Sequence, residues 1–361
     1  MKNYKICVYA ISKNESQFVS RWVESMQEAD AIYVLDTGST DDTVKKLKQK
    51  GVKVTKKEIK PWRFDVARNE SLKLLPKDTD ICVCTDLDEV FEPGWRQKLE
   101  EKWNENVTRA KYNYNWSFDE YGNPAVNFYI EKIHKRKGYK WVHPVHEVLQ
   151  ADFENDIIID DITLNHYPDS SKSRGNYLPL LELSVKEDPE DDRNMHYLGR
   201  EYMYYKKWNE CIDTLIKHLA LKSATWKDER SASMRFISRA YINLSRPLEA
   251  KMWLELAKKE TPYLREPFVE DAFLEYSKEN YEEAINDLKR ALNLEKPYKN
   301  YINEPFCYDG TIYDILSLSL FYAGIKEEAL IYAVKALEKD PKNERIQNNI
   351  KLIEESIKSP S

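Results

Sequence analysis

Short apolar runs alternate with amphipathic segments along the first part of the chain. The runs lie at residues 6–11, 31–35 and 81–84, and apolar residues between them recur at the three- and four-residue spacing of helices. Apolar runs of four to eight residues are typical of strands that are buried on both faces. The pattern therefore predicts a parallel sheet built from right-handed strand–helix–strand units.

The pattern changes beyond the third run. Residues 110–116 alternate and are rich in aromatic side chains, and a Gly-Asn-Pro turn separates them from residues 130–134. A further strand over residues 161–166 ends in a histidine and is followed by a proline turn. Because no helical pattern separates the first two of these segments, we expect an antiparallel extension of the sheet.

Paired amphipathic helices are predicted from about residue 174 to the end of the chain. Small residues in two of the expected second helices, Ala250 and Ala284, are 34 positions apart, which is the tetratricopeptide period. The other intervals are longer, and the tract at residues 295–309 interrupts the pattern. We expect an α/β domain over residues 1–170 and an all-α domain of tetratricopeptide-like helical repeats over residues 171–361.

Composition limits the classes of function. A length of 361 residues suits two domains, and a net charge of −6 without any basic block argues against nucleic acid as a partner. There is no apolar run long enough to span a membrane and no signal-peptide pattern, so we expect a cytoplasmic protein. The five cysteines do not form paired metal-ligand motifs, and we expect neither a cysteine-ligated zinc nor a redox site.

Carboxylates follow the predicted strand at residues 81–84. Asp86, Asp88 and Glu89 come at its carboxyl end, which is where open α/β sheets bind ligands. Two aspartates that are two positions apart can serve one divalent cation and the sugar nucleotide that it binds, because Mg²⁺ and Mn²⁺ prefer oxygen ligands and phosphates. The alternative is an exposed acidic turn. Glu89 could orient a metal-bound water or simply begin the following loop.

Four segments resemble, in order and spacing, the motifs of inverting glycosyltransferases of family 2. They are Asn14-Glu15, residues 34–43 (Val-Leu-Asp-Thr-Gly-Ser-Thr-Asp-Asp-Thr), residues 64–69 (Phe-Asp-Val-Ala-Arg-Asn) and residues 86–89 (Asp-Leu-Asp-Glu). The resemblance implies a Rossmann-like, nucleotide-sugar-binding GT-A fold, a nucleotide-diphosphate sugar donor and Mn²⁺ or Mg²⁺. The chain looks most like the branch that joins this domain to a helical-repeat tail. It departs from many relatives in having a single aspartate before Thr37-Gly38.

The resemblance also implies roles for residues of the donor site. Ala10 and Glu15 would lie at the bound nucleotide sugar, and Asp36 would accept a hydrogen bond from the nucleobase. Asp86 would face the ribose and Asp88 the metal. For Asp36 the alternative is a helix cap, a role that neighbouring hydroxyls could also fill.

Arg68 is expected to neutralise the charge of the donor diphosphate. Its planar guanidinium matches two phosphate oxygens at once, and it precedes the carboxylate-bearing strand. The alternative is a surface salt bridge with Asp65 or Glu70, which would contribute about 0–1 kcal/mol.

Residues 138–148 concentrate aromatic, imidazole and carboxylate groups and resemble the Val-His-Glu element of the same branch. Inverting transfer needs a base that deprotonates the acceptor as it attacks the anomeric carbon. Glu147 is the first candidate for this base and His146 the second. The alternative is that His143 and His146 are structural and that Glu147 is their partner.

His166, at the end of the last predicted strand, is a candidate third ligand for the metal or for the diphosphate. GT-A enzymes often complete metal coordination with a late histidine, and imidazole suits Mn²⁺ better than Mg²⁺. The alternative is a structural histidine beside the turn at Pro168.

Together these features predict an inverting, metal-dependent glycosyltransferase. It would move a sugar from UDP-glucose or UDP-GlcNAc to a protein, peptide or glycan acceptor, and its helical tail would bind the acceptor or a partner, or form a homodimer. The competing hypothesis is an interaction scaffold whose transferase domain is inactive. An inactive transferase domain would be expected to lack Asp86, Asp88 or Arg68, and this sequence retains all three.

Overall fold

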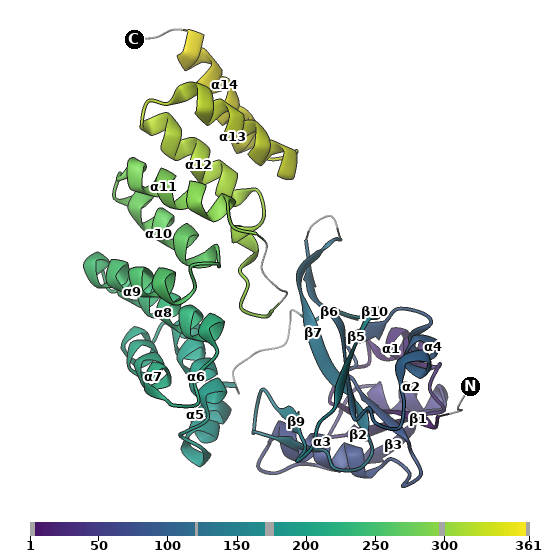
Figure 1. Cartoon of the computed structure of the whole chain (residues 1–361). Helices are drawn as coiled ribbons and strands as arrows, with labels where there is room; N and C mark the ends of the chain where they lie inside the picture. The colour runs from purple at the N-terminus through teal and green to yellow at the C-terminus, as the bar shows by residue number, and fades with distance from the viewer. Residues whose placement is uncertain (1–3, 120–121, 170–176, 296–299, 359–361) are drawn as a thin grey trace. The chain divides into compact units, whose positions relative to one another are not determined.

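The computed structural model describes residues 4–119, 122–169, 177–295 and 300–358. The chain forms two compact units (Figure 1). The first runs to Lys186 and also includes Asn300 and Tyr301, and the second comprises the other described residues from Glu187 onward. The predicted domain boundary between residues 170 and 171 lies outside the described residues.

An eight-stranded mixed sheet forms the centre of the first unit, in the order β3-β2-β1-β4-β7-β6-β10-β5. Its strands are β1 (Ile6–Ser12), β2 (Ala31–Asp36), β3 (Lys53–Lys56), β4 (Ile81–Cys84), β5 (Glu89–Phe91), β6 (Arg109–Phe118), β7 (Pro124–Lys135) and β10 (Asp156–His166). The first four strands in this order are parallel, as predicted. Strand β7 is antiparallel to β4 and β6, which confirms the predicted extension, whereas β10 pairs with β6 in parallel.

The two central strands explain why the sequence shows continuous apolar runs. Every residue of Ile6–Ala10 and of Ile81–Cys84 is fully buried. Ile6, Val8 and Ala10 pack in the larger apolar cluster, whereas Cys7 and Tyr9 pack in a second cluster. Alternate side chains thus enter separate apolar clusters, as expected for a sheet that is covered on both faces.

Helices and a small hairpin complete the first unit. They are α1 (Val19–Met26), α2 (Thr43–Gln49), α3 (Phe64–Lys73), α4 (Trp95–Lys102), α5 (Tyr177–Glu187) and the two-stranded β8 (Lys140–Val142) and β9 (Val148–Gln150). Asn69 of α3 joins the hairpin by two hydrogen bonds to Trp141: its Nδ2 donates to the carbonyl at 2.8 Å, and its Oδ1 accepts from the amide at 2.9 Å. The helix and the hairpin are therefore held in a fixed relation.

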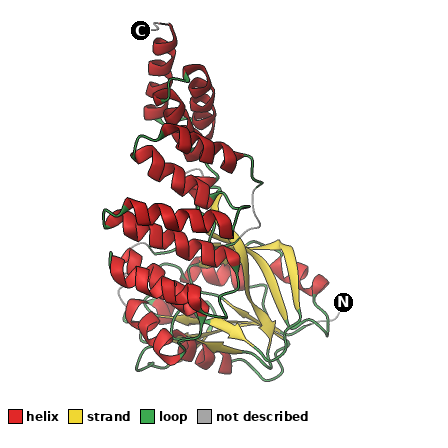
Figure 2. Ribbon diagram, turned by 60° about the vertical axis from the view of Figure 1, so that its left-hand side comes forward, coloured by secondary structure: helices red, strands yellow, loops and turns green. Residues whose placement is uncertain are grey.

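The second unit consists of helices that follow one another in pairs (Figure 2). They are α6 (Asp192–Tyr204), α7 (Trp208–Ala220), α8 (Lys227–Asn243), α9 (Pro247–Glu260), α10 (Glu266–Ser277), α11 (Tyr281–Leu292), α12 (Thr311–Tyr322), α13 (Lys326–Lys339) and α14 (Glu344–Lys358), with a short 3₁₀ turn η1 (Pro305–Cys307) before α12. Ala250 and Ala284 lie fully buried in α9 and α11, the second helices of their pairs. The predicted helical-repeat architecture is confirmed.

The turns within the pairs α6–α7, α8–α9, α10–α11 and α12–α13 share one backbone feature. One residue has a positive φ: 57° at Lys206, 58° at Ser245, 62° at Glu279 and 83° at Gly324. A left-handed residue of this kind satisfies the last carbonyls of the first helix and reverses the chain. Three of these four turns use a residue other than glycine.

All five cysteines are free and buried. Cys7, Cys82 and Cys84 belong to the first unit, and Cys211 and Cys307 belong to the second. Burial raises the pKa of the Cys84 thiol to about 11 and that of Cys211 to about 12. Free cysteines that are buried in this way behave as small apolar side chains.

None of the helices in the described ranges combines the length and the apolar character needed to cross a bilayer.

Candidate active site

The loops that follow the parallel strands meet at the carboxyl edge of the sheet. Asn14 Oδ1 accepts a hydrogen bond from the amide of Thr40 at 2.8 Å, and the amide of Glu15 donates to Thr43 Oγ1 at 2.8 Å. The loop after β1 is thereby joined to the loop after β2. The predicted motif containing Glu15 and the motif containing Asp36 thus form one surface, next to the carboxyl end of the strand that contains Ala10.

Asp36 ends β2 and stabilises the turn that follows it. Its side chain is 1% exposed and accepts hydrogen bonds from Ser12 Oγ at 3.1 Å, from the amide of Gly38 at 3.3 Å and from the amide of Ser39 at 3.0 Å. Gly38 has a φ of 118°, which a residue with a side chain adopts only with strain. Asp36 therefore shapes this loop, and its contact with a nucleobase stays a prediction.

Arg68 lies in the floor of the site and pairs with two carboxylates. Its side chain is 4% exposed; Nη2 lies 2.7 Å from Oδ1 of Asp86, and Nε donates to Oε1 of Glu147 at 2.9 Å. The alternative of an exposed pair with Asp65 or Glu70 is wrong. One guanidinium thus fixes two residues for which different functions are predicted.

Asp86 also meets a second buried cation. Oδ2 lies 3.2 Å from Nζ of Lys132, whose side chain is 16% exposed. Burial by itself would raise the pKa of Asp86, but the charges of Arg68 and Lys132 outweigh it and lower that pKa well below its usual range. Asp86 is therefore an anion at any physiological pH, and the alternative of an exposed acidic turn is wrong for this residue.

Glu89 begins β5 and is almost completely buried. Its Oε2 accepts from the amide of Asp86 at 2.8 Å, and its Oε1 accepts from the hydroxyl of Tyr114 at 2.8 Å and from Nζ of Lys132 at 2.9 Å. Burial raises the pKa of Glu89 despite the nearby lysine. Glu89 therefore belongs to the structure that holds Asp86 in position, rather than to an open loop.

Asp88 faces His166 across the edge of the sheet. Oδ2 of Asp88 lies 3.5 Å from Nε2 of His166, and Nδ1 of the histidine donates to the carbonyl of Trp116 at 3.0 Å. The imidazole also stacks on the Trp116 ring, with centroids 4.5 Å apart. Burial lowers the pKa of His166, but the bond and charge of Asp88 more than offset this and raise it.

The pair of Asp88 and His166 fits a divalent cation. The carbonyl of Trp116 holds one ring nitrogen, so the other nitrogen points toward the carboxylate, as in metal-binding histidines whose second nitrogen is hydrogen-bonded. Two donors held 3.5 Å apart have about the separation that ligands at roughly 2.0–2.2 Å from one ion adopt.

The predicted catalytic segment lies in the turn between β8 and β9. His143 and His146 both have left-handed backbones there, with φ of 76° and 51°. Glu147 follows and pairs with Arg68. Because Asn69 ties the hairpin to α3, which also carries Arg68, two connections to the same helix set the position of Glu147.

A cleft of about 490 Å³ opens beside His166. Its lining includes Phe18, Arg21, Phe118 and Tyr167. The guanidinium of Arg21 lies over the Tyr167 ring at 4.4 Å, and the rings of Tyr167 and Phe118 stack with centroids 5.4 Å apart. The cleft thus places an arginine and flat aromatic surfaces next to the candidate metal ligands.

Two contributors to the site could not be identified from the sequence. Lys132 lies in an alternating strand between Glu131 and Ile133, and a lysine next to another charged residue indicates a solvent-facing position. Trp116, the partner of His166, is 48% exposed and resembles any surface aromatic residue. Both acquire their roles only when β7 and β10 pair with the rest of the sheet.

Residues 7–150 match the family described as glycosyl transferase family 2. The first unit therefore contains a family 2 glycosyltransferase domain, joined to an all-helical unit. No curated protein matches the chain.

Solved structures resemble parts of the chain. Glucosyl-3-phosphoglycerate synthase from Mycobacterium tuberculosis, solved with Mn²⁺, UDP and glucosyl-3-phosphoglycerate, is 24% identical over 31% of this chain and 44% of its own, with a TM-score of 0.27. The MamA protein is 18% identical over 47% of this chain and 85% of its own, with a TM-score of 0.36. A thermophilic TPR protein in Thermus thermophilus is 21% identical over 49% of this chain and 88% of its own, with a TM-score of 0.36.

Proposed function

We propose that the protein is an inverting, metal-dependent glycosyltransferase that uses a nucleotide-diphosphate sugar, UDP-glucose or UDP-GlcNAc, as donor. The observation that carries the proposal is the Asp88–His166 pair at the carboxyl end of the β4 region, inside a family 2 domain. The inactive-scaffold alternative receives no support from the site, because its acidic and basic groups are assembled and paired.

Asp88 and His166 would hold Mn²⁺ or Mg²⁺. The bound ion would offset the negative charge that develops on the leaving diphosphate. Asp86 would accept hydrogen bonds from the ribose, and Arg68 and Lys132 keep it ionised and in place. Asp36, Glu15 and Ala10 would line the nucleoside end of the same site.

Glu147 is the proposed general base. As the nucleophilic oxygen of the acceptor attacks the anomeric carbon, the bond from that carbon to the diphosphate breaks and the proton of the acceptor passes to Glu147. Oε1 of Glu147 is held by Arg68 at 2.9 Å, and the carboxylate has a second oxygen that can take the proton. His146, its neighbour in the same turn, is the alternative base.

The helical unit would bind the protein, peptide or glycan acceptor, or a partner protein, or form a homodimer. Helical repeats present extended surfaces that suit such ligands. The acceptor would meet the sugar at the cleft beside His166, where Arg21 and Tyr167 offer charge and stacking.

Substitution of Asp88 tests the proposal. Asp88→Asn keeps the size of the side chain but removes the anionic ligand, so release of UDP from UDP-glucose or UDP-GlcNAc in the presence of Mn²⁺ should fall by at least about a hundredfold. Thermal stabilisation by Mn²⁺ with the donor should disappear as well, while the circular dichroism spectrum stays unchanged. Asp152→Asn, at an exposed carboxylate, is the matched control. Normal UDP release by Asp88→Asn would refute the metal assignment.

A further inference from the structure

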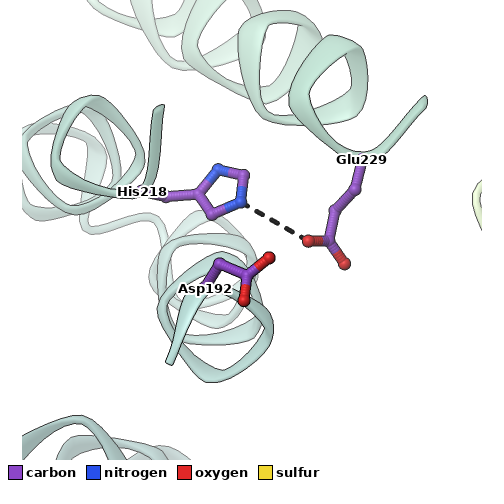
Figure 3. Close-up of side chains that lie close together, drawn as sticks. All are labelled: Asp192, His218 and Glu229. Carbon is purple, nitrogen blue, oxygen red and sulfur yellow. Dashed lines mark ion pairs between the residues drawn. The ribbon is translucent and has the colours of Figure 1, made fainter. Parts of the chain in front are cut away.

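Three side chains from successive helices of the second unit point toward one another (Figure 3). They are Asp192, the first residue of α6; His218, in the last turn of α7; and Glu229, in the first turn of α8. One donor atom from each lies within 4.8 Å of the others. Because successive helices run in opposite directions, the start of α6, the end of α7 and the start of α8 meet at the same end of the helix layer.

His218 is held by a hydrogen-bonded chain that reaches deep into the unit. Its Nδ1 lies 2.9 Å from Oγ of Ser233, and the same oxygen lies 2.7 Å from Nδ1 of His196. Ser233 has one hydroxyl proton, so if its hydroxyl donates a hydrogen bond to Nδ1 of His196, it accepts one from Nδ1–H of His218. Nε2 of His218 then presents a lone pair.

That lone pair is directed at the two carboxylates. His218 is completely buried, and among the described residues no group meets Nε2 as a hydrogen-bond partner. Oε1 of Glu229 is 3.4 Å away. This is too long for a charge-assisted hydrogen bond, whose usual length is about 2.7–2.9 Å. It is close to the separation of two ligands that each lie roughly 2.0–2.2 Å from one tetrahedral ion.

We propose that Asp192, His218 and Glu229 bind a divalent transition-metal ion, for which Zn²⁺ is the best match. One imidazole nitrogen and two carboxylate oxygens are a donor set that Zn²⁺ accepts, with a fourth position for water. The charge of the ion balances the two carboxylates, of which Glu229 is 4% exposed. The Ser233 hydroxyl orients the imidazole from the opposite side, as the outer partners of metal-binding histidines do.

Such an ion would connect α6, α7 and α8 at one end and would have a structural role. It is separate from the cation proposed at Asp88, because the two sets of ligands belong to different units. The proposal therefore does not depend on glycosyl transfer.

The test uses the full-length chain carrying Asp88→Asn, so that the other candidate cation site is disabled. After treatment with a chelator and addition of Zn²⁺, elemental analysis should find one ion per chain. Co²⁺ added in place of Zn²⁺ should give the visible absorption of a site with nitrogen and oxygen ligands. Zn²⁺ should also raise the unfolding temperature.

Three further substitutions, each made in the Asp88→Asn chain, test the ligands. Two replace a proposed ligand by its amide, and one removes the hydroxyl that orients His218. Asp192→Asn and Glu229→Gln should weaken Zn²⁺ binding by at least tenfold, and Ser233→Ala should weaken it by roughly 10–100-fold. Asp213→Asn, at an exposed carboxylate on α7, should have no effect. Asp192 is only partly buried, so Asp192→Asn remains informative if Glu229→Gln does not fold. Absence of zinc from the Asp88→Asn chain, or unchanged affinity in Asp192→Asn, would overturn the proposal.

Discussion

Arg68 and Lys132 bring two positive charges into the candidate active site with side chains that are 4% and 16% exposed. Between them lies Asp86, and Glu147 and Glu89 lie on the outer sides. A buried ion is costly unless it is paired, so this alternation of charges is what allows five ionisable groups to share a small volume.

The positions of Asp36, Asp86 and Asp88 could be predicted because these acids end or directly follow apolar strands, and that of Arg68 because it lies in a short motif of α3, the helix before β4. Lys132 could not, because its partners are more than forty positions away and only the pairing of β7 with β4 brings them together.

Glu147→Gln tests the proposed base. The variant keeps an oxygen that can accept from Arg68 but cannot take a proton from the acceptor. Transfer should fall by roughly a hundred- to ten-thousandfold, whereas the affinity for UDP-sugar should change little. Calorimetric titration with the donor and a transfer assay with the true acceptor separate the two quantities. If Glu147→Gln transfers normally while His146→Ala binds donor but is inactive, the base is His146.

The burial of His134 should make the free energy of unfolding depend on pH. Nε1 of Trp141 donates to the hydroxyl of Tyr9, the hydroxyl donates to Nε2 of His134, and Nδ1 donates to the carbonyl of Lys135. Burial lowers the pKa of His134 to about 3, so the folded state holds a neutral imidazole.

Below the ordinary histidine pKa of about 6.5, the unfolded chain takes up a proton that the folded chain does not. The contribution of His134 to the free energy of unfolding is therefore fully present above that pH and is lost as the pH falls toward 3. The loss is about 1.4 kcal/mol between pH 7.5 and pH 5.5. Urea unfolding at the two values measures the loss. His134→Gln should remove this contribution, and an unchanged pH dependence in that variant would contradict the assignment.

At the scale of secondary structure, strands with continuous apolar runs of four or more residues could be predicted, and the three-residue strand β5 could not. β1, β2 and β4 lie where the hydrophobic pattern places them. β5, by contrast, has three residues and exists only because it pairs with the end of β10, about 75 positions later. A three-residue strand has no readable period, so its presence depends on distant chain segments.

The left-handed turns of the helical unit give a testable prediction at this scale. A left-handed backbone costs a residue with a side chain about 1–2 kcal/mol, and glycine avoids that cost. Glu279→Gly should therefore raise the unfolding temperature by roughly 2–4 °C, and Gly324→Ala should lower it by a similar amount.

The two turn variants serve as controls for each other, because the same backbone effect should shift their unfolding temperatures in opposite directions. Glu279 is exposed, and a methyl group at Gly324 would meet no atom within 4 Å, so backbone conformation is the main term that changes at both sites. Differential scanning calorimetry measures both shifts. A decrease in both variants would show that the turn conformation does not limit stability.

At the scale of the molecule, donor chemistry and acceptor binding are assigned to different units. Every residue proposed for donor and metal binding or as the base lies before Lys186. A chain that ends at Lys186 should therefore release UDP from the donor in the presence of Mn²⁺ but should fail to transfer the sugar to the true acceptor. Size-exclusion chromatography establishes that the shortened chain is monodisperse. Transfer at the full rate by this chain would remove the helical unit from acceptor recognition.

The distribution of the five buried thiols offers a way to observe the two units separately. Each thiol reacts with an alkylating reagent only when the structure around it opens, and mass spectrometry of peptides assigns each modification to its cysteine. The rates at Cys82 and Cys84 would then measure the opening of the α/β unit, and those at Cys211 and Cys307 the opening of the helical unit. The native chain thus contains intrinsic reporters that resolve, without added labels, which unit a ligand or a substitution has stabilised.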